Sequence, residues 1–166
     1  MTATEALEAI RAFGEHEHLD LARGLDLVHD SACAVGVGSR IDTVRAIGDV
    51  LRWSEATLEP HIAWEESWLY PQIDALTQTP WATRAARFDH RQIRSLASRL
   101  RQDRALCADG LAPADEVRGH LFAYEALLRT HIDREEHLLL PVLAGEGVSA
   151  IAGWRRPGDA PDGPRG

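Results

Sequence analysis

The chain has 166 residues, a formal net charge of -8 and a hydrophobic fraction of 45%. This length suits one domain with a single core that needs no disulfide or structural metal to fold. The acidic excess, without a basic stripe interleaved with aromatic residues, argues against a nucleic-acid partner. No apolar run is long enough to span a bilayer and the first residues lack the features of a secretory signal, so we expect a cytoplasmic protein with no membrane partner.

Two long amphipathic helices are predicted in the first half of the chain. The first should run from about residue 4 to residue 31, with an apolar face at helical spacing that includes Leu21, Leu25 and Val28. The second should run from about residue 41 into the mid-seventies. Pro60 and Pro71 lie inside it and are expected to bend it locally.

Two more helices follow after a turn at residues 77–80. The third should begin at Pro80 and end near residue 107, and the fourth should run from Pro113 to about residue 143. Short connections between long helices favour antiparallel neighbours, so we predict an all-α, up-down-up-down four-helix bundle over residues 1–144. The Gly- and Pro-rich segment 145–166 is expected to be a partly disordered tail.

An eleven-residue pattern occurs twice, as HIAWEESWLYP in residues 61–71 and as HIDREEHLLLP in residues 131–141. Both copies read H-I-x-x-E-E-x-x-L-x-P. Residues i and i+4 of an α-helix share one face, so each copy aims an imidazole and a carboxylate at the same place. The pattern therefore predicts a metal site that includes His61, Glu65, His131 and Glu135.

Each of these motif helices is preceded by a helix with an acidic–His pair, Glu17-His18 in one case and Asp89-His90 in the other. The spacing from His18 to the first motif nearly equals that from His90 to the second, which indicates an internal duplication with two-fold pseudo-symmetry. With a rise of about 1.5 Å per residue, all of these positions fall in one layer of the bundle. His18 is favoured over His16 in the first helix because its face continues into the apolar positions given above.

A cluster of imidazoles and carboxylates buried together is costly without a cation, so the predicted ligands are His18, His61, Glu65, His90, His131 and Glu135. Two carboxylates between two pairs of histidines would bridge two ions. Nitrogen and oxygen ligands without thiolate suit iron, manganese or zinc, and iron is favoured.

Some neighbouring residues have two interpretations. Glu66 and Glu136 lie about 100° around the helix from the proposed bridges, and either they are solvated or they orient a ligand imidazole. Tyr70 and Tyr124 are expected to be core or rim aromatics, although a tyrosine beside an oxidised metal pair can also ligate it or donate an electron.

On the two motifs and the preceding histidines, residues 4–143 resemble the hemerythrin-like domains, also called HHE cation-binding domains. The resemblance implies a bundle around two iron ions, oxo- or hydroxo-bridged when oxidised, with Glu65 and Glu135 as bridges. Oxygen-carrying hemerythrins have H-x-x-x-H in the third helix and H-x-x-x-x-D in the fourth, whereas here Arg94 follows His90 and the fourth helix offers Glu135. One histidine ligand is missing, which argues against reversible oxygen carriage.

The function expected from this resemblance is that of a non-haem di-iron protein. It would bind or sense a small oxidant, either a diatomic ligand such as oxygen or nitric oxide or a peroxide, in redox or iron homeostasis. The alternative is a di-iron oxidoreductase that consumes peroxide or acts as an oxidase. A zinc- or manganese-bound structural bundle is the third hypothesis, and no catalytic residue or protein partner is assigned.

Overall fold

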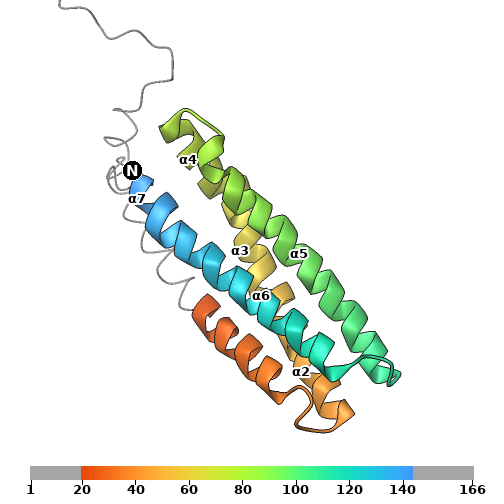
Figure 1. The fold of residues 1–166 in the computed structure, drawn as a ribbon. Coiled ribbons are helices and arrows are strands. Elements are labelled where there is room, and N and C mark those ends of the chain that lie inside the picture. The colour runs from red at the N-terminus through yellow and green to blue at the C-terminus, as the bar shows by residue number, and fades with distance from the viewer. Residues whose placement is uncertain (1–19, 144–166) are drawn as a thin grey trace, which may run out of the picture.

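The computed structural model describes residues 20–143, and every regular element in that range is a helix (Figure 1). The start of the predicted first helix, with His16 and His18, and the predicted tail at 145–166 lie outside the described residues. Within that range, no helix has the length and apolar character needed to cross a membrane. The described part of the chain is an all-helical bundle, as the sequence predicts.

The helical bounds lie close to the predicted ones. Residues 20–34 form the first helical segment, which continues past the predicted end at residue 31. The remaining elements are, in chain order, α2 (Arg40–Trp53), η1 (Ser54–Leu58), α3 (Glu59–Trp64), η2 (Glu65–Leu69), α4 (Tyr70–Thr77), α5 (Trp81–Ala108), α6 (Ala114–Arg134), η3 (Glu135–Leu139) and α7 (Leu140–Leu143). The η elements are π-helical turns, so α2 to α4 form one continuous helix, and α6 to α7 form another.

The turn between α4 and α5 differs slightly from the prediction. The C-terminal cap of α4 is Gln78, in the left-handed conformation with φ of 54°. The hydroxyl of Thr79 then accepts a hydrogen bond from the backbone N–H of Trp81. Pro80 therefore caps α5 instead of opening it, and Pro113 stands in the same way before α6.

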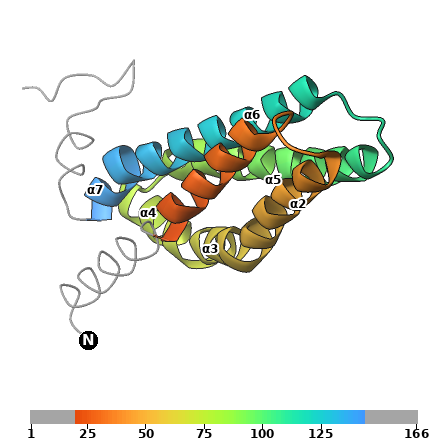
Figure 2. The same cartoon turned by 90° about the horizontal axis from the view of Figure 1, so that it is seen from below.

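Each proline inside a helix follows a π-helical turn. The residue before each proline donates its backbone N–H to the carbonyl five residues back: Glu59 to Ser54, Tyr70 to Glu65, and Leu140 to Glu135. Proline has no N–H and clashes with the carbonyl four residues before it, and a wider turn relieves that clash. The sequence predicted a local bend at Pro60 and Pro71, and the structure places a π turn before each of them. Figure 2 shows the resulting curve of α2, α3 and α4.

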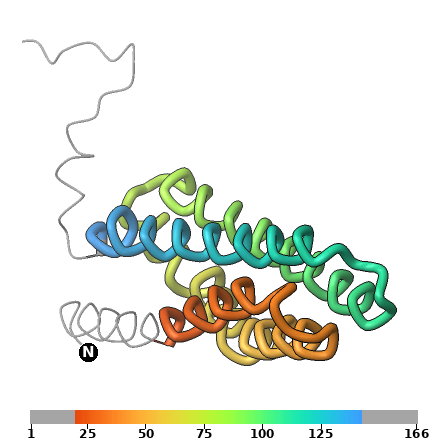
Figure 3. Tube along the Cα trace, turned by 60° about the horizontal axis from the view of Figure 1, so that its bottom comes forward, coloured from red at the N-terminus to blue at the C-terminus, as the bar shows by residue number. Residues whose placement is uncertain are grey.

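Four helical rods surround the core. Helix α5 packs against α2 and α6, and α4 packs against α5 and α7. The segment 20–34 is the fourth rod and packs beside α2 and α6 (Figure 3). Gly24 lies against Trp53 of α2, and His29 bonds to Glu125 of α6. The α4–α5 turn and the α5–α6 connection lie at opposite ends of the molecule in Figure 1.

Two apolar clusters enclose one polar layer. The larger cluster reaches Ile62, Ile93 and Leu128. The smaller one contains Leu69, Tyr70, Ile73, Ala86, Leu139 and Val142. Glu65, His90, His131 and Glu135 each lie along their helix between residues of the two clusters, so the fold places them in a layer closed by hydrophobic packing on both sides.

Candidate metal centre

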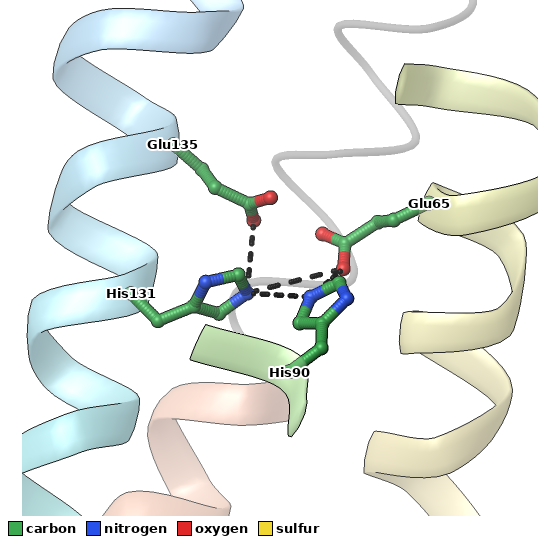
Figure 4. A group of neighbouring side chains, drawn as sticks. All are labelled: Glu65, His90, His131 and Glu135. Atoms are coloured by element: carbon green, nitrogen blue, oxygen red, sulfur yellow. Dashed lines mark hydrogen bonds and ion pairs between the residues drawn. The ribbon is translucent and has the colours of Figure 1, made fainter. Parts of the chain in front are cut away.

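Four buried side chains from three helices converge in this layer (Figure 4). Glu65 opens η2, His90 comes from α5, His131 lies near the end of α6 and Glu135 opens η3. Each offers one ligand atom, and these atoms all lie within 4.8 Å of one another. None of the four residues is more than 2% exposed. The cluster is thus closed to bulk water on the described sides.

The ring nitrogens and carboxylate oxygens point into one space. His90 Nε2 lies 3.1 Å from His131 Nε2 and 3.1 Å from Glu65 Oε2. His131 Nε2 in turn lies 3.9 Å from Glu65 Oε2 and 3.7 Å from Glu135 Oε2. Such convergence of several lone-pair donors is the arrangement that a cation requires.

His61 lies on the other side of Glu65. Its Nε2 is 2.8 Å from Glu65 Oε1, whereas Oε2 of the same carboxylate faces His90. The two oxygens of Glu65 therefore face imidazoles that come from different helices. A carboxylate placed in this way can bridge two cations, each bound by its own histidines.

The tautomer of His90 follows from its outer partner. Its Nδ1 lies 3.0 Å from Glu66 Oε1, and an ionised carboxylate only accepts hydrogen bonds. We therefore assign the ring proton to Nδ1, which leaves the lone pair of Nε2 pointing into the cluster. The imidazole is oriented and protonated as a metal ligand would be.

Burial and mutual charge set the ionisation of the other groups in the metal-free protein. Burial lowers the pKa of His131 to about 3, so this imidazole is neutral. Burial acts to raise the pKa of Glu65, but its contacts with His61 and His90 hold that pKa below its usual range. Burial and the charge of Glu65 together raise the pKa of Glu135. The cluster thus offers the neutral imidazole of His131 and the ionised carboxylate of Glu65.

The residues present fit a metal ion. Within the described part of the chain, both carboxylate oxygens of Glu65 and Nδ1 of His131 are buried and make no hydrogen bond. Glu65 lies close to imidazole nitrogens without hydrogen-bond geometry. Buried polar atoms without partners are costly, and a cation among them removes that cost. Nitrogen and oxygen donors without thiolate suit iron, manganese or zinc.

Comparison with known families agrees with this geometry. The family model for the hemerythrin HHE cation binding domain matches residues 10–143, a range that contains both motifs and His90. The chain belongs to this hemerythrin family. A search of curated proteins and a search of solved structures each found no match. Membership in a cation-binding family and the cluster of ligand atoms both indicate that this site binds a metal ion.

Five of the six ligands predicted for this hemerythrin domain lie in the described range. Four of them form the cluster of Figure 4, and His61 joins it through Glu65. The sixth, His18, and its alternative His16 lie outside the described residues. The first imidazole of the layer therefore stays a prediction.

Tyr70 is a core residue, as expected, and it also touches the metal layer. Its hydroxyl donates to Glu135 Oε1 at 2.5 Å and lies 3.1 Å from His90 Nε2. Burial, together with the adjacent carboxyl groups of Glu135 and Glu65, raises its pKa, so the phenol stays protonated. The π turn that starts at Glu65 brings Tyr70 one wide turn further along the same face. In the sequence, the signal for this wider turn was Pro71, which directly follows Tyr70.

Arg94 stands where oxygen-carrying hemerythrins have a histidine, and it contacts carboxylates outside the cluster. Its Nε donates to Glu59 at 3.1 Å and its Nη1 donates to Glu66 at 3.1 Å. Burial opposes the effect, but hydrogen bonds from Arg94 and His90 hold the pKa of Glu66 below its usual range. Glu66 is therefore the residue that orients a ligand imidazole, the second of its two interpretations.

Proposed function

We propose that this hemerythrin domain holds two iron ions in a non-haem centre. Glu65 and Glu135 would be the bridging carboxylates, and the histidine ligands would be His18, His61, His90 and His131. The observation that carries the proposal is the position of Glu65, whose two oxygens face His61 and His90 separately. One ion would require only one of these contacts. When bound, such an iron pair supplies electron exchange with small oxidants.

The proposed site has two equivalent halves in an up-down-up-down bundle. Both π turns of the site begin at the proposed bridging residues, and both precede a proline of the repeated motif, Pro71 or Pro141. This correspondence supports an internal duplication, because the motif and its backbone irregularity occur together in both copies. Tyr70 breaks the symmetry, since the equivalent residue of the second copy is Leu140.

The function we propose is the binding or sensing of a small oxidant in the cytoplasm, in redox or iron homeostasis. Oxygen, nitric oxide and peroxide are the ligand class. The closed polar layer supports this choice, because the ligands of the cluster are at most 2% exposed and apolar clusters lie on both sides. Among the described residues, side chains this buried offer almost no exposed surface to a large substrate.

A di-iron oxidoreductase is the second candidate, and Tyr70 favours it. Its phenol donates to Glu135 at 2.5 Å and can exchange a proton at this carboxylate. We would measure peroxide consumption per protein for the wild type and for Tyr70→Phe. Sustained turnover that falls about tenfold or more in the variant would support the enzyme. Absence of turnover in the iron-loaded wild type would leave binding or sensing.

The first experiment is a visible and near-ultraviolet spectrum of iron-loaded protein, reduced without oxygen and then exposed to air. Bound iron is quantified on the same sample. We expect two irons per chain and ferric charge-transfer bands that grow on exposure. Protein that retains zinc or manganese but no iron would instead support a structural bundle and would contradict the proposal.

A further inference from the structure

Three arginines line a surface hollow at the start of α5, beside the turn that follows α4. Arg84, Arg87 and Arg91 are three and four residues apart, so they lie on one face of the helix. Together with Pro80 and Trp81 they line a cavity of about 370 Å³. In the described part of the chain no acidic side chain lines this hollow. We refer to these five residues as the arginine pocket.

Two of these guanidinium groups have no carboxylate partner among the described residues. Arg84 lies over the ring of Trp81 at 4.4 Å. Arg91 lies over Phe88 and donates to the carbonyl of Arg87. Both arginines are exposed.

Arg94 and Arg101 of the same helix are neutralised by carboxylates. Arg94 pairs with Glu59 and Glu66, and Arg101 pairs with Glu55. In a chain with a formal net charge of -8, the arginine pocket is thus a local region of uncompensated positive charge.

The third arginine is held in place by the fold. Arg87 donates to Thr83 Oγ1 at 3.3 Å and pairs with Asp74 at 3.5 Å, while its guanidinium lies over the ring of Tyr70. It is half-buried, in contrast to its two neighbours. The pocket therefore has one fixed cation at its base and two exposed cations at its rim.

The backbone adds to the positive potential. Helix α5 has 28 residues and its N-cap, Pro80, makes no side-chain cap hydrogen bond. The positive end of the helix dipole therefore lies beside Arg84, in the first turn of the helix. Trp81 is 68% exposed and gives the pocket an aromatic wall. Positive charge beside an exposed ring fits an anion that is attached to a planar or apolar group.

We propose that the arginine pocket binds a phosphate group, either free phosphate or the phosphate of a small organic monoester. Guanidinium groups match phosphate oxygens in geometry and bind them through paired hydrogen bonds. The dianionic charge of phosphate matches the two exposed arginines. This inference is independent of the proposed metal chemistry, because none of the pocket residues is a proposed metal ligand.

The test is calorimetric titration of the metal-loaded protein with inorganic phosphate and, separately, with phenyl phosphate, at constant ionic strength. We expect saturable binding of one ligand per chain. Arg84→Gln with Arg91→Gln should weaken it by about tenfold or more, because charge-assisted hydrogen bonds are lost. Equal affinity for both probes would identify free phosphate as the ligand, and tighter binding of phenyl phosphate would identify an organic monoester.

Arg101→Gln is the matched control, because it removes an exposed arginine of α5 that already has a carboxylate partner. It should leave phosphate binding unchanged. Metal content and thermal unfolding of each variant exclude indirect effects, and Arg87 is left unchanged because of its contact with Tyr70. Non-saturable titration would overturn the proposal. So would binding that persists in the double variant, since that signal would come from the metal centre.

Discussion

His90 donates its Nδ1–H to Glu66 at 3.0 Å, and Glu66 is the sequence neighbour of Glu65, whose Oε2 faces the opposite nitrogen of the same ring. Two consecutive glutamates of one helix thus hold the two sides of an imidazole from another helix. Arg94 fixes the outer glutamate from α5 itself. The orientation and the tautomer of His90 therefore depend on residues outside the ligand set.

Glu66→Gln should weaken metal binding without unfolding the bundle. The amide is a weaker acceptor for the Nδ1–H of His90, and loss of such an outer partner costs about 10- to 100-fold in metal affinity. Affinity is measured by competition with a chelator, and thermal unfolding of the metal-free protein checks the fold. Glu55→Gln is the control, because Glu55 pairs with Arg101 on the surface. Equal affinities in both variants would contradict the role of Glu66.

Glu135→Gln should separate metal binding from folding. Burial and the charge of Glu65 raise the pKa of Glu135, which favours its neutral carboxyl group in the metal-free protein, and an amide of similar shape can replace that group. Tyr70 can still donate to the amide oxygen. We expect the free energy of unfolding of the metal-free variant to stay within about 1 kcal/mol of the wild type. The rise in unfolding temperature on adding metal should disappear.

Glu65→Gln is the informative comparison for that experiment. Glu65 is ionised and contacts two imidazoles, so its replacement should destabilise the metal-free protein as well. If both variants lose the same free energy of unfolding without metal, the assignment of different charges to the two carboxyls is wrong.

His131 should lower the stability of the metal-free protein on mild acidification. Burial lowers the pKa of His131 from its usual 6.5 to about 3, so below pH 6.5 the unfolded chain binds a proton that the folded chain does not. The stability contributed by His131 should therefore fall between pH 6.5 and pH 4.5, with a slope of up to about 1.4 kcal/mol per pH unit, whereas the raised pKa of Glu135 acts in the opposite direction. Glu65 has a depressed pKa, so its contribution is lost only at lower pH.

Urea unfolding of the metal-free protein across this pH range checks the prediction. His131→Asn removes the titrating ring, so the stability of the variant relative to the wild type should rise as the pH falls below 6.5. Identical slopes for the two proteins would show that another group controls the acid response.

The sequence predicted the helices and most of the site because both depend on helical periodicity. Residues such as Leu21, Ile93 and Leu128 are buried at the positions that this periodicity gives. The π turns depart from this periodicity, and only the proline that follows each turn marks them in the sequence. The sequence therefore predicts Tyr70 in the core but not its hydrogen bond to Glu135. Glu66 was placed on an outer face, but only the packing of α5 shows that this face meets His90.

Gly24→Ala should destabilise the bundle by about 1–3 kcal/mol, because an added methyl group would overlap the indole of Trp53. A Cβ atom at this position would lie 1.8 Å from the nearest ring atom. Gly119→Ala is the control, since a Cβ atom there meets nothing within 4 Å. It should stabilise α6 by up to about 1 kcal/mol through helix propensity. Urea unfolding of both variants gives the two free energies, and similar values would contradict the close contact.

The remaining ligand of the first helix is predicted to be His18. Its helical face continues into three residues that the structure buries, Leu21, Leu25 and Val28. The face of His16 continues into Asp20 and Arg23, which pair with each other on the surface at 2.9 Å. His18→Ala should therefore lower bound iron per chain and weaken its retention against a chelator, while His16→Ala keeps the wild-type values. The reverse result would assign the ligand to His16 and would rotate the first helix relative to this prediction.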